Sequence, residues 1–178
     1  MKKTTIISSI AFTFIMLISL NMNAQKFAKI DKSPMDAVAF PSSNRVSDKL
    51  IKVVYSRPQL KGRELSKLAP NNKVWRTGAN EAANITFYKD MKIENNIVKA
   101  GEYSLFTIPG DNEWTIILNK DINVWGAYSY NESNDVVRVK AAVSSATDSL
   151  EAFSIAFDDK GNMHLGWGTT RVAVPFTE

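Results

Sequence analysis

The chain has 178 residues, with 22 lysines and arginines against 18 aspartates and glutamates, no cysteine, and a single histidine, His164. The missing cysteines exclude disulfides, thiol catalysis, zinc–thiolate sites and iron–sulfur clusters. One histidine cannot build a histidine-rich zinc or copper site. It could serve a Ser-His-Asp triad, but the sequence contains no G-x-S-x-G elbow to present a serine nucleophile. We therefore expect no metal and no cofactor.

Residues 1–24 have the features of a cleaved signal peptide. Lys2 and Lys3 precede an apolar stretch from Ile6 to Leu20, and the segment ends on the small residue Ala24. The stretch is short for a membrane span, which needs about 20 apolar residues. No cysteine follows, so a lipoprotein anchor is excluded. We expect a periplasmic or secreted protein that starts near Gln25 and has no membrane span; an uncleaved N-terminal anchor is the alternative.

The charge of the mature chain gives no sign of a nucleic-acid partner. Removing Lys2 and Lys3 leaves 20 basic residues against 18 acidic ones, a formal charge of +2. Binding to phosphates needs a concentrated basic patch, and the sequence has no run of basic residues. We therefore expect no nucleic-acid binding.

The mature chain begins with a mixed polar lead-in, residues 25–49, and from Leu50 onward apolar residues recur at every second position. This period is typical of strands that bury one face, and β-branched and aromatic residues dominate the runs. The runs cover residues 51–55, 85–87, 103–105, 114–118, 137–139, 153–157, 163–167 and 172–176. Gly62 to Leu68 is the one helical candidate, about two turns long.

Turn-forming residues separate these runs. Glu94-Asn95-Asn96 predicts a tight hairpin, and Pro109 to Asn112, Asn131 to Asp135 and Asp158 to Asn162 predict further connections. The acidic turn at Asp158 lacks the spacing of a calcium loop, so we expect an ordinary hairpin loop there. Together the pattern predicts an all-β fold: residues 50–178 forming a single antiparallel β-sandwich, jelly-roll-like, with at most one short helix.

Several blocks of residues resemble a family of exported bacterial proteins known as domain of unknown function 2911. The blocks are Tyr55-Ser56-Arg57-Pro58, Gly62-Arg63, Trp75-Arg76-Thr77-Gly78-Ala79-Asn80-Glu81-Ala82, Ala100 to Pro109, Trp114 to Ile117, Trp125-Gly126 and Trp167-Gly168. Leu65-Ser66 and Ala83 depart from the family's pattern. The resemblance implies one exported β-rich domain and no established activity.

The octapeptide Trp75–Ala82 concentrates an indole, a guanidinium, an amide and a carboxylate in a loop-like stretch. Trp75 is expected to be an exposed stacking platform, and Arg76 can hold a carboxylate or phosphate of a ligand with its planar fork. Alternatively, Arg76 pairs with Glu81 and locks the loop. Asn80 can contact a ligand or bond to its own turn.

The remaining tryptophans and the histidine divide between core and surface. Trp114 and Trp167 share strand faces with aliphatic residues and are expected in the core. Trp125 lies beside Gly126 and fits either place. His164 alternates with Met163 and Leu165, so its side chain is expected on the opposite face, in a structural or solvated role or as an acid–base group.

Three functions remain open. The first is a ligand-binding module in which Trp75, Arg76, Asn80, Glu81 and Trp125 hold a small polar ligand or a glycan. The second is a structural or partner-binding envelope protein in which the octapeptide only supports the fold. The third is a hydrolase that uses Glu81 with a second carboxylate, such as Glu102 or Asp135. The directions of the Arg76, Asn80 and Glu81 side chains distinguish these hypotheses.

Overall fold

The computed structural model describes residues 25–178, so the predicted signal peptide lies outside the described residues. The chain divides into two units, Met1–Ile30 and Asp31–Glu178. Of the first unit, residues 25–30 are exposed and have no regular secondary structure. The second unit carries the strands. Among the described residues, no helix has the length and apolar character needed to cross a membrane.

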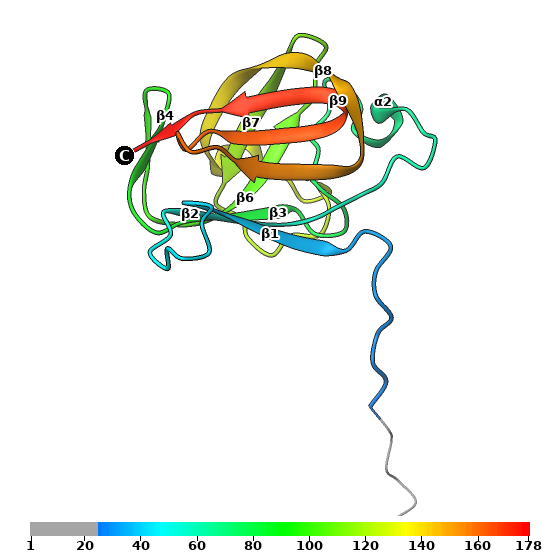
Figure 1. Cartoon of the computed structure of the whole chain (residues 1–178), viewed down its shortest axis with the longest axis horizontal. Coiled ribbons are helices and arrows are strands. Elements are labelled where there is room, and N and C mark those ends of the chain that lie inside the picture. The colour runs from blue at the N-terminus through cyan, green and yellow to red at the C-terminus, as the bar shows by residue number, and fades with distance from the viewer. Residues whose placement is uncertain (1–24) are drawn as a thin grey trace, which may run out of the picture. The chain divides into compact units, whose positions relative to one another are not determined.

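Seven strands form one antiparallel sheet in the order β1-β2-β3-β6-β7-β8-β9 (Figure 1). They are β1 Met35–Phe40, β2 Ile51–Ser56, β3 Ala83–Phe87, β6 Gly101–Ile108, β7 Glu113–Asn119, β8 Asp135–Phe157 and β9 Met163–Val174. A smaller sheet has the order β10-β4-β5, with β10 Phe176–Thr177, β4 Met91–Ile93 and β5 Asn96–Val98. The described residues add only α2 Leu65–Leu68 and the 3-10 turn η2 Glu132–Asn134. The predicted all-β antiparallel class is confirmed.

The large sheet curls into a half-barrel because β8 takes part in two of its walls. The first part of β8 pairs with β7, and the part beyond Ala142 pairs with β9, with register shifts that bend the strand. Residues just after β2 then reach β8 from the other end of the sheet: the N–H of Leu60 donates to Glu151 O at 2.9 Å, and that of Phe153 donates to Pro58 O at 2.9 Å. In Figure 1, β1, β2 and β3 form the lower wall, and β8 and β9 the upper one.

The Tyr55-Ser56-Arg57-Pro58 block fastens the two walls together. The buried hydroxyl of Tyr55 accepts the N–H of Ile155 at 2.9 Å, a hundred residues away in the sequence. Arg57 donates to Phe153 O at 3.1 Å, to Ser154 Oγ at 2.7 Å and to Asp36 Oδ2 at 3.1 Å. These residues of β2 and its exit therefore hold the second half of β8 over the core.

Aromatic rings fill the centre of the half-barrel. Trp75 stacks on Trp167 with ring centroids 5.6 Å apart and meets Trp114 and Phe153 edge-on at 6.0 and 5.0 Å. Trp114 and Trp167 are 3% and 1% exposed, which confirms both as core residues. The alternating apolar residues of the other strands complete the same cluster.

Local details differ from the pattern-based expectations. The hairpin between β4 and β5 is present, but its positive φ of 52° falls on Glu94 and not on an asparagine. The helix is shorter than predicted because Gly62 has a φ of 73°, which an α-helix does not accommodate, so α2 begins only at Leu65. β1 lies within residues 25–49, the segment interpreted as a lead-in, and pairs with β2 along all six residues.

Candidate functional site

The octapeptide loop, Trp75–Ala82, is held at both ends by backbone hydrogen bonds. Trp75 exchanges two bonds with Thr107 of β6, at 2.7 and 2.9 Å, and the N–H of Ala83 donates to Arg76 O at 2.9 Å. At its far end, the N–H of Ala82 donates to Val124 O at 2.9 Å. These backbone bonds join the loop to β6 and to the segment around Val124.

Small residues inside the loop allow it to lie against β2. A Cβ added at Gly78 would lie 3.0 Å from Ser56 O, so only glycine fits there without displacing backbone. Thr77 is fully buried, with its hydroxyl 3.3 Å from that of Thr107. Thr77 and Asn80 both adopt positive φ, at 52° and 63°. These features assign residues 75–79 to the framework of the fold.

Trp75 is not the exposed platform that the sequence suggested; that expectation is wrong. Its side chain is 5% exposed and lies between Trp167, Trp114 and Phe153. The reason is its antiparallel bridge to Thr107, which sets Trp75 beside β6 with its indole turned toward the core. The alternation of Trp75 and Thr77 was the available sequence signal, since both residues point to the interior.

Arg76 and Glu81 do not form the predicted ion pair. No carboxylate of residues 25–178 lies within ion-pair distance of Arg76, and its buried Nε has no hydrogen-bond partner there. The loop-locking alternative is therefore wrong, and backbone bonds hold the loop instead. Glu81 is exposed.

Glu81 lines a groove on the outer face of β2, β3 and β6, which we call the outer groove. Its polar and aromatic lining includes Lys52, Glu81, Asn84, Thr86, Tyr88 and Glu102. The volume is about 430 Å³, within the range of small-molecule sites. Sequence reasoning had not singled out Lys52, Asn84 or Thr86. The signal was present, because they occupy the positions that alternate with buried Val53 and Ile85.

Strand register arranges the floor of the outer groove in two rows. Lys52, Thr86 and Glu102 lie side by side on three neighbouring strands, and Val54, Asn84 and Ser104 form the next row. Neighbouring strands are about 4.8 Å apart, so Lys52 and Glu102 stand about 10 Å apart at Cα. The side chain of Asn84 donates a hydrogen bond to Glu102, which draws this carboxylate toward the second row and the Glu81 end.

Trp125 is the backbone neighbour of Glu81, which lies at one end of the outer groove, but the lining of the groove does not include Trp125 itself. Glu81 and Trp125 form an antiparallel bridge, and the N–H of Gly126 donates to Asn80 O at 2.9 Å. Residues opposite each other in such a pair project their side chains to the same face. The sequence was compatible with Trp125 in the core or on the surface; its side chain is 60% exposed, so it is a surface residue. The structure thus brings together Asn80, Glu81 and Trp125, and leaves Trp75 outside this group.

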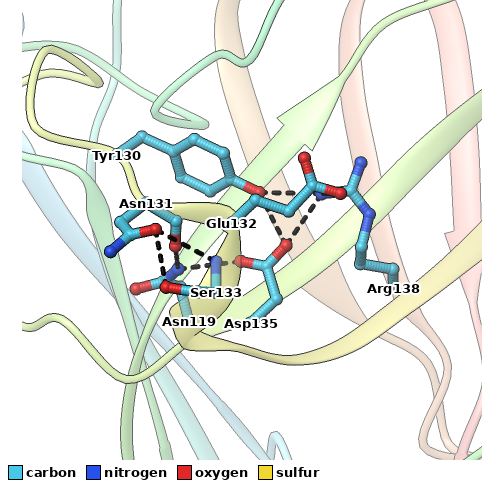
Figure 2. A network of polar contacts seen from close by, with 7 residues as sticks. All are labelled: Asn119, Tyr130, Asn131, Glu132, Ser133, Asp135 and Arg138. Atoms are coloured by element: carbon cyan, nitrogen blue, oxygen red, sulfur yellow. Dashed lines mark hydrogen bonds and ion pairs between the residues drawn. The ribbon is translucent and has the colours of Figure 1, made fainter.

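The segment that carries Trp125, residues 120–134, is anchored by a buried polar network (Figure 2). Asn119, fully buried, donates to Asp135 Oδ1 at 2.8 Å and to Asn131 O at 3.0 Å. The other oxygen of Asp135 accepts from the Tyr130 hydroxyl at 2.6 Å and from Arg138 at 2.7 Å. Burial, followed by the Asp135 carboxylate, raises the pKa of Tyr130 well above its usual range.

This network removes Asp135 as a candidate catalytic partner of Glu81. Its side chain is 6% exposed, and both of its oxygens already accept hydrogen bonds. Glu102, by contrast, lines the same groove as Glu81. Of the two carboxylates proposed from the sequence, only Glu102 shares a surface with Glu81.

His164 takes part in a turn and does not line the outer groove. Its Nε2 lies 2.9 Å from Asp158 Oδ2, and its side chain is 43% exposed. Asp158 also accepts the N–H groups of Lys160 and Asn162, both at 2.9 Å. The His164 contact first, and then the Asn162 amide, hold the pKa of Asp158 well below its usual range. The turn's carboxylate is thus occupied by donors, as in an ordinary hairpin loop.

The Asn80 side chain lies near Asp31, a residue that precedes β1. It contributes, after the N–H of Ser33, to lowering the pKa of Asp31. Ser33 N lies 2.7 Å from Asp31 Oδ1.

Comparison with known proteins gives a family and no function. No curated protein and no solved structure matches the chain. The model of a family described as "Protein of unknown function (DUF2911)" matches residues 33–176, from just before β1 into β10. The match spans every strand of the half-barrel, including the octapeptide loop and the outer groove. The chain belongs to the DUF2911 family.

Proposed function

We propose that the protein is a ligand-binding module that takes a small polar or carbohydrate ligand in the outer groove. The observation that carries the proposal is the exposed indole of Trp125, fixed beside Glu81 at the end of a groove lined by amides, hydroxyls and charged groups. An aromatic face supplies contact area for a sugar ring, and the polar groups supply orientation. The ligand contacts that we propose are Trp125, Glu81, Asn84 and Glu102.

The chemistry of the lining favours a hydroxyl-bearing ligand. Lys52 donates, Glu81 and Glu102 accept, and the Asn84 amide does both. Sugar hydroxyls can also do both, so one ring can satisfy several of these groups at once. No ion pair among the described residues uses Lys52, Glu81 or Glu102, and the Glu102 carboxylate accepts a hydrogen bond from the Asn84 amide that also lines the groove.

Calorimetric titration with a panel of neutral glycan fragments tests the proposal. We expect saturable binding to the wild-type protein and loss of most of the affinity in Trp125→Ala and in Glu81→Gln. Ile97→Ala is the matched control, because Ile97 of β5 is 59% exposed, close to the 60% of Trp125, and lies in the other sheet. A panel that gives no heat of binding, or a loss of affinity equal in all three variants, would refute the proposal.

A second candidate, glycoside hydrolysis, follows from the two carboxylates in one groove. Glu81 would transfer the proton and Glu102 would act as the second carboxyl, which requires a separation of about 5–10 Å. Release of reducing ends from a glycan, lost in both Glu81→Gln and Glu102→Gln, would support hydrolysis. If glycan binds but is recovered intact after prolonged incubation, hydrolysis is excluded and the binding function is retained.

The third candidate, a structural or partner-binding envelope protein, draws support from residues 75–79, which serve the framework. It predicts that the wild-type protein binds no glycan of the panel and that Trp125→Ala leaves folding unchanged.

Export is part of the proposal and has its own test. We infer that residues 1–24 are removed and that the mature protein, without a lipid anchor, is periplasmic or secreted; the charged start, the apolar stretch and Ala24 support this. Intact-mass measurement of the protein from a bacterial expression host should give a chain that starts near Gln25. A chain that keeps residues 1–24 and sediments with membranes would contradict it.

A further inference from the structure

We propose that the outer groove binds a linear oligosaccharide chain, gripped by Trp125 at one end and Tyr88 at the other, and not a single sugar. This inference rests on the proposed binding function. Tyr88 lines the groove and is 51% exposed, and Trp125 stands beside the opposite end at 60%. Exposed aromatic rings at both ends of a polar groove are the arrangement that a chain of rings can use.

The length of the groove exceeds one ring. Tyr88 follows β3, and Glu81, which pairs with Trp125, precedes it. The seven residue steps between Glu81 and Tyr88, at about 3.3 Å each in extended chain, span about 23 Å. A single ring stacked on Trp125 leaves Tyr88 without a partner. Several linked rings running along β3 reach both.

Hydrogen bonds anchor the backbone at both aromatic ends, so a ligand need not order the chain that carries the two rings. The network of Asn119, Tyr130 and Asp135 fixes the segment that presents Trp125 (Figure 2). At the other end, the N–H of Tyr88 donates to Leu50 O at 2.9 Å, which fixes the start of the turn after β3. Contacts made by preordered groups lose less free energy to ordering on binding.

Charge selects a neutral chain over a strongly charged one. Lys52 lies opposite Thr86, nearer the Tyr88 end of the groove, with Glu102 in the same row on the other side of β3 and Glu81 at the Trp125 end. A polyanion would meet two carboxylates, and a polycation would meet the ammonium group of Lys52. Hydroxyl and acetamido groups can bond to all three without a repulsive pair.

The test uses chitin and cellulose oligosaccharides of one, two, four and six units in calorimetric titrations with the full mature chain. We expect affinity to rise with length, with the six-unit chain binding at least about tenfold more tightly than the single sugar. Trp125→Ala and Tyr88→Ala should each reduce affinity for the six-unit chain by about tenfold; Trp125→Ala should also weaken binding of the single sugar, whereas Tyr88→Ala should change it less. Ile97→Ala should leave the whole series unchanged. Circular dichroism and melting of each variant check that it is folded.

The outcomes separate this inference from the function on which it rests. If the single sugar binds as tightly as the six-unit chain, the groove is a one-ring site: the chain inference fails and the binding function stands. If Tyr88→Ala binds the six-unit chain like the wild type, the chain does not reach β3's far end, and the inference fails in the same way. If no oligosaccharide of either series binds, both proposals fail.

Discussion

Removing the hydroxyl of Tyr55 tests how the half-barrel is closed. In Tyr55→Phe the N–H of Ile155 loses its acceptor at 2.9 Å, and Ile155 is only 3% exposed, so water does not replace the lost partner. A buried donor left without a partner costs about 1–3 kcal/mol. The second contact, from the hydroxyl to Ile155 O, is 3.4 Å long and adds little. We expect the free energy of unfolding to fall by about 2 kcal/mol, or about 4–8 °C in Tm.

Urea unfolding followed by circular dichroism measures this change, with an unaltered slope showing that only stability changed. Tyr103→Phe is the matched control, because its hydroxyl donates to Lys99 O only four residues away on the exposed surface. It should change stability by less than about 0.5 kcal/mol. Equal losses in the two variants, or no loss in Tyr55→Phe, would show that the two walls close without this bond.

The same residue predicts an effect of alkaline pH. Burial raises the pKa of the Tyr55 hydroxyl above its ordinary value of 10.0. A group whose pKa is raised by folding contributes stability that is fully present below the unfolded pKa and lost as pH rises through the folded pKa. The difference in stability between the wild type and Tyr55→Phe should therefore shrink above pH 10. If the difference in stability between the two proteins stays constant up to the pH at which they unfold, the pKa of Tyr55 is not raised by folding.

Three further substitutions test the framework. Gly78→Ala places a Cβ 3.0 Å from Ser56 O and should cost about 1–3 kcal/mol in thermal unfolding; an unchanged Tm would contradict the close approach. Asn119→Ala leaves Asp135 short of a donor and should speed amide exchange in residues 120–134 selectively. Asp158→Asn should flatten the fall in stability on acidification: the lowered pKa of Asp158 gives stability that is present above its unfolded value of 3.8 and lost as pH falls toward the folded one. If stability falls with acidification in Asp158→Asn as it does in the wild type, Asp158 does not contribute to the acid sensitivity.

The strands could be predicted from the sequence because their signal is local. Met163, Leu165 and Trp167 occupy every second position of β9, and all three side chains are buried, as period-two alternation predicts. The curl of the sheet could not be predicted in this way. It depends on residues 58–60 meeting β8 about a hundred positions later, and no property of either segment alone specifies the other.

The outer groove was missed for a related reason. Asn84 and Thr86 are visible in the sequence as polar residues alternating with a core face, but polar outward residues are the normal condition of a strand. What makes them part of a groove is register, which sets Thr86 beside both Lys52 and Glu102. Register between strands that are not joined by a tight turn is a property of the tertiary structure.

The octapeptide loop combined two roles that the sequence could not separate. Folding explains three of its residues: Trp75 fills the core, Thr77 is buried beside Thr107, and Gly78 permits the approach to β2. Glu81 is different, because the backbone bonds of its neighbours hold the loop and its own carboxylate has no ion-pair partner among the described residues. Folding therefore does not account for a carboxylate at this position. We propose instead that Glu81 and Trp125, and not Trp75 and Arg76, contact a ligand, because Glu81 lines the outer groove and is paired with a residue whose indole is exposed.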